Sequence, residues 1–319
     1  MNNRLDNAAL CAKVFMPDSI RDYFDCLYTD FDKDMLSGTD ENGFVTGEYR
    51  ASWLDHLYKR GVLALEAQAK GEYRYKAAMV DARLESFIVL EKAYWLSLPD
   101  DVRRAITDRY IMNPDIWIPK YIKSGDTETI LPLEDCLRLV EESDCRYYNL
   151  AQCNCNNYIM GCAANKSDVC LSFESHPPEP NTPAHRGLTR AVTKEDALAV
   201  LRRADRQGLV HTYNAAHHHV CNCCPCCCVH HHRTEKYRDA IRRSYLRTPC
   251  MITAQTESCR HCGQCIKRCP FAVLSLGKDG VVIASDQCLG CGICRQACPA
   301  GVLRIVGRER RVKQDENKH

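Results

Sequence analysis

The stretch from residue 259 to residue 299 contains one cysteine pattern twice: Cys259-x2-Cys262-x2-Cys265-x3-Cys269-Pro270, then Cys288-x2-Cys291-x2-Cys294-x3-Cys298-Pro299. The second copy begins 29 residues after the first (259 to 288). Three cysteines at every third position cannot share one face of a helix or a strand. A loop wrapped around an inorganic cluster can use all three, because each thiolate then reaches a different iron. The spacing therefore predicts iron–sulfur sites.

Residues of about 250–306 resemble bacterial two-cluster ferredoxins in these motifs and in the residues beside them. Gly263 and Gly292 follow the second cysteine of each run, where we expect a positive φ and a close approach of the backbone to sulfide. Pro270 and Pro299 follow the fourth cysteine, where a fixed φ turns the chain away. The resemblance implies a ferredoxin-like βαβ-repeat domain over residues 249–306 that binds two [4Fe-4S] clusters.

Each cluster is expected to take ligands from both runs. In the bacterial two-cluster spacing, the fourth cysteine of each run ligates the cluster of the other run. The cluster 1 ligand set is then Cys259, Cys262, Cys265 and Cys298, and the cluster 2 ligand set is Cys288, Cys291, Cys294 and Cys269. Zinc is the alternative metal, since CxxC pairs also bind it. A pair of zinc sites does not account for a CxxCxxCxxxCP pattern that occurs twice.

The chain as a whole has 319 residues, 23 cysteines, 45% hydrophobic residues and a net charge of +2. The length suits two or three domains. We see no signal peptide at the N-terminus and no apolar window of roughly eighteen residues that could span a membrane. In such a chain cysteines indicate metal ligands rather than disulfides, so we expect a cytoplasmic protein from an anaerobic setting. The small net charge makes nucleic acid an improbable partner.

Residues 1–143 are expected to form a mostly helical domain, which makes the chain α+β overall. Residues 49–60 place Trp53, Leu57 and Tyr58 on one helical face. Residues 62–65 and 73–76 then read as two strands around a turn. Helix and hairpin over 48–80 indicate a winged-helix element. The seven basic and five acidic side chains of residues 48–83 are a weak footprint for DNA, which favours a protein-docking wing.

A cysteine-rich region over 144–248 is expected to bind further metal. Its first group is Cys153-x-Cys155-x6-Cys162-x7-Cys170, and the polar residues between these thiols include Asn154, Asn156, Asn157, Lys166 and Asp168. The four cysteines would complete a third four-iron cluster. A structural zinc site with the same four ligands is the alternative. Iron is favoured because the chain has iron–sulfur motifs elsewhere.

The second group in this region lies between two histidine triplets, 217–219 and 230–232. It comprises six cysteines: Cys221, Cys223, Cys224, Cys226, Cys227 and Cys228. Cys221, Cys224 and Cys227 repeat the every-third spacing of the ferredoxin-like runs. Three interpretations stay open: a fourth cluster, a bridged or larger cluster, and a soft-metal site for zinc, copper or a heavy metal with thiolate and imidazole ligands.

Three further patterns define the chain between and after these groups. Residues 176–183 are rich in proline and indicate an extended linker. Thr193-x-x-Asp196 begins a helix as a capping box, and residues 209–213 read as a strand after Gly208. The basic stretch 233–247 indicates a helix that could dock an acidic redox partner. A charged tail follows at 307–319.

Residues of about 48–306 also resemble a loosely defined group of anaerobe iron–sulfur proteins whose reaction is undefined. The resemblance rests on Cys153-Asn154-Cys155 with Cys162 and Cys170, on Gly208-Leu209-Val210-His211, and on the Cys221–Cys228 segment. It implies cluster binding and names no substrate.

The sequence therefore predicts an electron-transfer protein that relays low-potential electrons through [4Fe-4S] clusters to or from a partner oxidoreductase. Two alternatives stay open. One is an iron–sulfur reductase with its reactive centre at the Cys221–Cys228 site, and the other is a redox- or metal-responsive regulator that uses the winged element. No dinucleotide fingerprint, P-loop or His-Glu-x-x-His motif occurs, so the sequence does not decide whether the chain is an enzyme.

Overall fold

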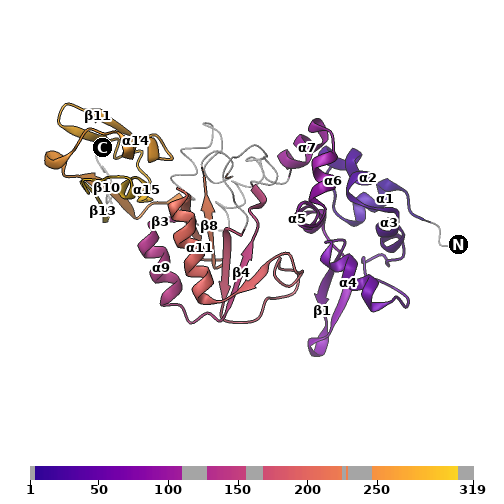
Figure 1. Ribbon diagram of the computed structural model, residues 1–319. Helices are drawn as coiled ribbons and strands as arrows, with labels where there is room; N and C mark the ends of the chain where they lie inside the picture. The colour runs from indigo at the N-terminus through magenta and orange to yellow at the C-terminus, as the bar shows by residue number, and fades with distance from the viewer. Residues whose placement is uncertain (1–3, 110–127, 156–167, 225–227, 229–245, 308–319) are drawn as a thin grey trace, which may run out of the picture. The chain divides into compact units, whose positions relative to one another are not determined.

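The computed structural model describes residues 4–109, 128–155, 168–224, 228 and 246–307 (Figure 1). It is 40% helix and 23% strand, which confirms the mixed helix-and-strand class predicted from the sequence. The chain forms two compact units. The first takes residues 1–118, 144–197 and 226–233, and the second takes residues 119–143, 198–225 and 234–319.

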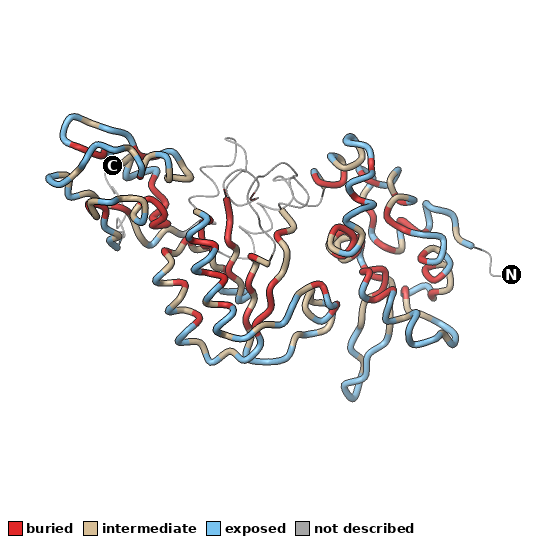
Figure 2. The backbone as a smooth tube through the Cα atoms, in the orientation of Figure 1, coloured by how far each residue is buried: buried red, intermediate tan, exposed pale blue. Residues whose placement is uncertain are grey.

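Short helices build the N-terminal part of the first unit: α1 (Asn7–Lys13), α2 (Phe24–Leu27), α3 (Asp30–Ser37), α4 (Ala51–Lys59), α5 (Val80–Leu90), α6 (Lys92–Ser97) and α7 (Asp100–Thr107), with the 3-10 turns η1 (Asp18–Tyr23) and η2 (Ala69–Gly71). Their apolar side chains make one core, in which Trp95, Phe87 and Phe24 are buried. Figure 2 shows this buried backbone in red along the helices. The mostly helical N-terminal part is as expected.

Buried charges also hold this core together. Arg60 donates to Asp32 Oδ1 at 2.5 Å, and Arg83 Nη2 lies 2.7 Å from Glu91 Oε1. Asp32 and Arg83 are fully buried, so each would be costly without its partner. Asp32 also closes a capping box with Thr29 at the start of α3.

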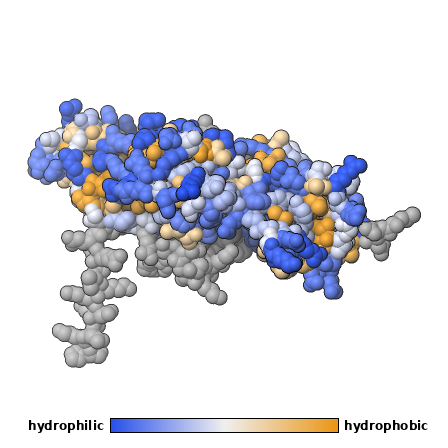
Figure 3. Space-filling model, turned by 90° about the horizontal axis from the view of Figure 1, so that it is seen from below, coloured by the Kyte–Doolittle hydropathy of each residue, from blue (hydrophilic) through white to orange (hydrophobic). Residues whose placement is uncertain are grey.

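The helix and hairpin predicted over 48–80 are present. Helix α4 precedes an antiparallel hairpin of β1 (Leu63–Ala67) and β2 (Tyr73–Ala77), in which Leu65 is opposite Tyr75. The winged-helix classification of this part stays a prediction. Large apolar side chains such as Trp53 and Tyr73 are exposed here. On the face shown in Figure 3, apolar residues lie in small patches among hydrophilic ones.

The proline-rich stretch is not an extended linker. Asn181 has a left-handed φ of 70°, and its side-chain amide pairs with both the N–H and the C=O of Leu65 in β1. Arg186 is buried and donates to the carbonyls of Tyr58 and Leu63. Polar side chains that satisfy backbone groups of the hairpin thus fix this segment on the first unit, which proline content alone does not predict.

The rest of the first unit is a small antiparallel ladder. Strand β4 (Tyr147–Ala151) pairs with β5 (Cys170–Glu174) on one side and with β6 (Arg190–Val192) on the other. Tyr148 and Phe173 face each other and stack at 6.4 Å between ring centroids. These strands were not predicted from the sequence.

The second unit has its own ladder. Strand β7 (Val210–Asn214) pairs antiparallel with β8 (His219–Cys223) and with β3 (Glu128–Leu131), and β3 pairs parallel with β9 (Leu246–Arg247). Helix α9 (Leu133–Glu141) packs against β3 and β7. Pro132 is the N-cap of α9.

Helix α11 (Lys194–Arg206) starts as predicted. Thr193 Oγ1 accepts from the Asp196 N–H at 3.1 Å, and Asp196 Oδ2 accepts from the Thr193 N–H at 3.3 Å. Gly208, with a φ of 81°, follows the helix, and β7 comes next. The predicted basic helix over 233–247 lies outside the described residues except for its last two, which form β9.

The C-terminal domain of the second unit has two similar halves. The first runs β10 (Cys250–Ala254), η4 (Thr256–Ser258), α14 (Gln264–Arg268) and β11 (Leu274–Gly277), and the second runs β12 (Gly280–Ile283), α15 (Ile293–Gln296) and β13 (Leu303–Gly307). Strand β10 pairs with β13, and β11 pairs with β12, both antiparallel. None of the helices in the described ranges is long and apolar enough to cross a membrane.

Candidate metal centre

The two cysteine runs occupy equivalent places in the two halves of the C-terminal domain. In each run the first two cysteines lie in a loop, the third lies in a short helix, and the fourth follows that helix. Gly263 and Gly292 are the N-cap residues of α14 and α15, with φ values of 67° and 80°. The positive φ expected at both glycines is confirmed.

The backbone repeats at other positions with the same offset of 29 residues. His261 and Gly290 have φ values of 54° and 69°, and Ala272 and Gly301 have φ values of 51° and 62°. Residues other than glycine rarely adopt this left-handed backbone conformation, so His261 and Ala272 in the first half are strained. The second half has glycine at both positions and avoids this strain. The two loops therefore have similar backbone conformations at these positions.

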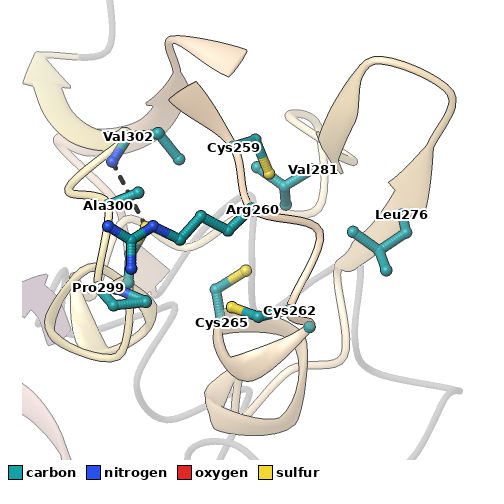
Figure 4. Close-up of a pocket in the computed structure, with 11 residues that line it drawn as sticks. Cys259, Arg260, Cys262, Cys265, Leu276, Val281, Pro299, Ala300 and Val302 are labelled. Atoms are coloured by element: carbon teal, nitrogen blue, oxygen red, sulfur yellow. Dashed lines mark hydrogen bonds between the residues drawn. The ribbon is translucent and has the colours of Figure 1, made fainter. Parts of the chain in front are cut away.

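Four cysteines from both runs line one pocket of about 320 Å³, measured with the solvent at its mouth. They are Cys259, Cys262, Cys265 and Cys298, the cluster 1 ligand set proposed from spacing. Figure 4 shows the sulfurs of Cys259, Cys262 and Cys265 directed into the same space. Leu276, Val281 and Val302 complete an apolar wall. Thiol donors from both runs around an apolar hollow fit a four-iron cluster.

Cys269 lies with the second run, although it belongs to the first. Burial, together with smaller contributions from the charges of Cys269 and Cys288, raises the pKa of Cys291 to about 12. Burial likewise raises the pKa of Cys294, with added repulsion from Cys291, Cys269 and Cys288. Burial is also the main cause of the raised pKa of Cys265 in the first run. The charges of Cys298, from the second run, and of Cys262 raise this pKa as well. The fourth cysteine of each run is thus within electrostatic reach of the other run.

The two groups differ in exposure. Cys288, Cys291 and Cys294 are between 4% and 7% exposed, whereas Cys262 is an exposed residue. Backbone N–H groups reach sulfur in both: Val302 donates to Cys298 Sγ and Gly290 to Cys288 Sγ, each at 3.4 Å. Such N–H···S bonds and burial are the means by which a protein sets the potential of a bound cluster.

Two cysteines of the 153–170 group, Cys153 and Cys170, lie at the same end of the β4–β5 pair. Cys170 is the first residue of β5 and lies opposite Ala151, the last residue of β4. Cys153 is buried just beyond β4, and Cys155 packs against the helical core. Cys162 lies outside the described residues. The antiparallel pairing of β4 and β5 thus brings Cys170 opposite Ala151, two residues before Cys153.

The 221–228 group begins in a strand and not in a loop. Cys221 and Cys223 are part of β8, where alternate side chains share a face, and Cys223, Cys224 and Cys228 are buried. Cys226 and Cys227 lie outside the described residues. The every-third spacing of this segment therefore does not give it the conformation of the ferredoxin-like loops.

His219 and Glu128 accompany Cys221, and the sequence did not single out Glu128. Burial lowers the pKa of His219, but the charge of Cys221, a hydrogen bond to Cys221 and the charge of Glu128 outweigh it and raise the pKa to about 9. His219 Nε2 is 3.8 Å from Glu128 Oε1, and Glu128 is 1% exposed. The signal that could have pointed to Glu128 is its acidic side chain in an otherwise apolar strand, Glu-Thr-Ile-Leu.

Within the described ranges, no three or more His, Cys, Asp or Glu side chains come close enough together to hold one metal ion.

Comparison with known proteins assigns part of the chain. A family model described as a 4Fe-4S dicluster domain matches residues 258–302. No curated protein and no solved structure matches the chain. The matched residues contain all eight cysteines of the two runs. A domain of this family supports iron–sulfur clusters and iron–sulfur electron transfer in general.

Proposed function

We propose that this chain is an iron–sulfur electron-transfer protein that relays low-potential electrons to or from a partner oxidoreductase. The observation that carries the proposal is the pocket lined by Cys259, Cys262, Cys265 and Cys298, which unites thiols from both runs. A [4Fe-4S] cluster, when bound, takes up and gives back one electron at a time. The order strand–helix–strand in each half supports a βαβ repeat for the domain.

The two ligand sets have different tasks in this proposal. Cluster 1 is held by Cys259, Cys262, Cys265 and Cys298, of which Cys262 is exposed, and cluster 2 is held by Cys269 together with the buried Cys288, Cys291 and Cys294. Exposed Arg260 and Leu276 stand at the cluster 1 pocket. The partner therefore exchanges electrons at the cluster 1 face. Reduced thiols of this kind favour a cytoplasmic location.

The upstream groups extend the relay in the same proposal. Cys153, Cys155 and Cys170, with Cys162, would hold a third cluster, and the Cys221–Cys228 segment would hold a further cluster or a soft metal. The shared edge of β4 and β5 supports the first of these sites. Zinc remains the alternative metal at both.

A reductase is the second candidate, because one observation favours reactivity at Cys221. A cationic His219 hydrogen-bonded to Cys221 stabilises a thiolate, and a thiolate is the form that binds soft metals or attacks a substrate. In a reductase, adding the substrate should change the EPR signal of one cluster. In a carrier no small molecule should change it, and electrons should pass to an acceptor protein.

Four single variants test the crossed ligand sets: Cys298→Ala, Cys269→Ala, Cys262→Ala and Cys291→Ala. Each is reconstituted anaerobically with iron and sulfide, and its reduced EPR spectrum is compared with that of the unmodified chain. If the sets are crossed, Cys298→Ala alters the same signal as Cys262→Ala, and Cys269→Ala alters the same signal as Cys291→Ala. The opposite grouping would disprove crossing. An unmodified chain that binds no iron would disprove the proposed function itself.

A further inference from the structure

The structure joins two motifs that the electron-transfer proposal leaves without a role. His211 ends the Gly208-Leu209-Val210-His211 stretch, and Asn222 stands between Cys221 and Cys223. The two residues are directly opposite in the β7–β8 ladder, and His211 Nδ1 is 2.6 Å from Asn222 Oδ1. Both are buried. Because an amide oxygen only accepts, the Nδ1 atom of His211 carries a proton.

The other ring nitrogen of His211 faces a buried carboxylate. Among the described residues His211 Nε2 has no hydrogen-bond partner, and it lies 3.7 Å from Asp205 Oδ1. The Asp205 side chain is only 3% exposed. Its other oxygen, Oδ2, accepts from Nε2 of Gln296 in α15. A continuous polar chain thus runs from Asn222 through His211 and Asp205 to Gln296.

The contact between His211 Nε2 and Asp205 Oδ1 can become a hydrogen bond only if one more proton is bound there. With Nδ1 protonated and Nε2 bare, a nitrogen lone pair would face a carboxylate oxygen away from water, which is unfavourable. A proton between Nε2 and Oδ1 turns the contact into an attraction and neutralises the buried carboxylate. The His211–Asp205 pair is therefore built to hold one proton.

No other described charge on the neighbouring elements neutralises Asp205. Arg268 of α14 donates to the backbone carbonyls of Asp205 and Arg206, at the end of α11, and not to the carboxylate. Cys136 of α9 is close enough for Asp205 to raise its pKa, after burial and Asp135. From β3 and β8 the titratable groups are Glu128, which pairs with Asn214, His219, which lies 3.8 Å from Glu128, and Cys221 and Cys223 on either side of Asn222.

Gln296 connects the pair to the cluster-binding domain. It lies two residues from Cys294 of the cluster 2 set and two residues from Cys298 of the cluster 1 set. We propose that His211 and Asp205 form a redox-linked proton site for the α15 end of the two-cluster domain. An external one-electron reductant adds one electron to a cluster, and one proton from solvent joins the pair between Nε2 and Oδ1. Both leave on oxidation.

The physical cause is charge balance. An electron added near a buried, water-poor site makes the nearby anionic state of the pair less favourable, because charges interact strongly at low dielectric. Proton uptake by the pair offsets the added charge and makes reduction easier. This inference rests on the proposed function, since it requires clusters at the two runs.

The test is a redox titration of the cluster-loaded full chain at several pH values, with cluster signals followed by EPR and proton uptake followed by an indicator dye. We expect the potential of at least one cluster to fall as pH rises, by at most about 59 mV for each tenfold drop in proton concentration. Asp205→Asn should remove this dependence. Its amide can accept from Gln296 and donate to a neutral His211 Nε2, so the variant keeps the polar chain without the proton.

Glu195→Gln is the matched control, because it removes an exposed carboxylate from the same helix. It should behave as the unmodified chain does. Loaded clusters whose potentials do not change with pH would overturn the inference and leave the proposed function standing, even if Asp205→Asn does not fold. An Asp205→Asn protein that keeps the full pH dependence would also overturn it. Failure to bind iron would instead overturn the proposed function, and this inference with it.

Discussion

At the scale of one residue, Gly290 in the second loop has no room for a side chain. Its φ is 69°, and a Cβ added there would lie 2.1 Å from the carbonyl oxygen of Cys250 in β10. Gly263 in the first loop also has a positive φ, of 67°. A Cβ added to Gly263 would have no atom of the described residues within 4 Å. The two glycines share a conformation but not a close neighbour.

Gly290→Ala should therefore cost more than Gly263→Ala. The latter pays only the left-handed strain of about 1–2 kcal/mol and should keep both clusters. Gly290→Ala must in addition push β10 away from the loop that holds Cys288 and Cys291, so it should lose cluster 2. Thermal unfolding and iron content of the two reconstituted variants measure this. Equal losses in both would contradict the role given to the contact with Cys250.

The buried thiols give opposite pH dependences to the metal-free and the cluster-loaded chain. Burial raises the pKa of Cys291 from 9.0 to about 12. In the metal-free chain such a group stabilises the fold fully below pH 9, and that stability is lost as pH rises toward 12, at about 1 kcal/mol per pH unit. A thiol must lose its proton to ligate iron, so cluster binding strengthens with rising pH.

Chemical denaturation of the metal-free chain between pH 8 and about 11 should show the loss of stability, with Cys291→Ala, which has no thiol to ionise, losing less. The visible absorbance of the loaded chain should disappear on acidification and not on mild alkalinisation. A metal-free chain that becomes more stable above pH 9 would show that Cys291 is not buried as a neutral thiol.

At the scale of elements, the segment around Arg186 is the clearest case of structure that the sequence does not announce. Arg186 Nη1 donates to the carbonyls of Tyr58 and Leu63, and its guanidinium lies 4.5 Å from the centre of the Tyr58 ring. Arg186→Ala would remove the buried donor that both carbonyls share, although the Tyr58 carbonyl would still accept from the Gly61 N–H. We expect a loss of about 1–3 kcal/mol in the free energy of unfolding, and faster proteolysis between residues 176 and 188.

Arg190→Ala is the matched control for this prediction. Arg190 lies four residues later, and its ion pair with Asp168, at 3.2 Å, is on the surface. An exposed pair of this kind contributes at most about 1 kcal/mol. If both variants unfolded at the same denaturant concentration, the anchoring role of Arg186 would be wrong.

Elements with local signals could be predicted, and elements that depend on distant partners could not. Helix α4, the β1–β2 hairpin and the capping box of α11 follow from periodicity, turn residues and the Thr193–Asp196 pair. Strands β3, β4 and β8 are short, and they carry Glu128, Asn149 and Asn222 at buried positions. Polar residues at such positions hide a strand pattern, and their partners lie far away in the sequence.

The same division applies to the candidate sites over the whole molecule. The cysteine spacing at 259–298 is a local signal, so both ligand sets follow from the order of residues along the chain. The His211–Asp205 pair could not be predicted in this way, because it needs β7, α11 and α15 together, and residue 296 lies 91 positions from residue 205. A motif such as Gly208–His211 shows only that a histidine lies near the start of a strand, and the sequence does not show which residues contact it.

The number of metal ions per chain is the prediction that concerns the whole molecule. With only the 259–298 sites filled, anaerobic reconstitution should give about eight irons per chain, and with the upstream sites filled it should give about twelve to sixteen. Cys170 opens β5 opposite Ala151, two residues before Cys153, and Cys221 is hydrogen-bonded to His219. We therefore expect the higher range, counted together with sulfide and zinc.

Variants at each group assign the extra iron to its site. Cys153→Ala with Cys170→Ala should lower the count by about four, and Cys221→Ala with Cys224→Ala should lower it by a further cluster. Cys11→Ala is the control, because Cys11 is a buried core cysteine and should not change the count. Eight irons in the unmodified chain, with zinc making up the remainder, would confine electron transfer to the C-terminal domain. The upstream thiols would then hold the fold together as structural zinc ligands.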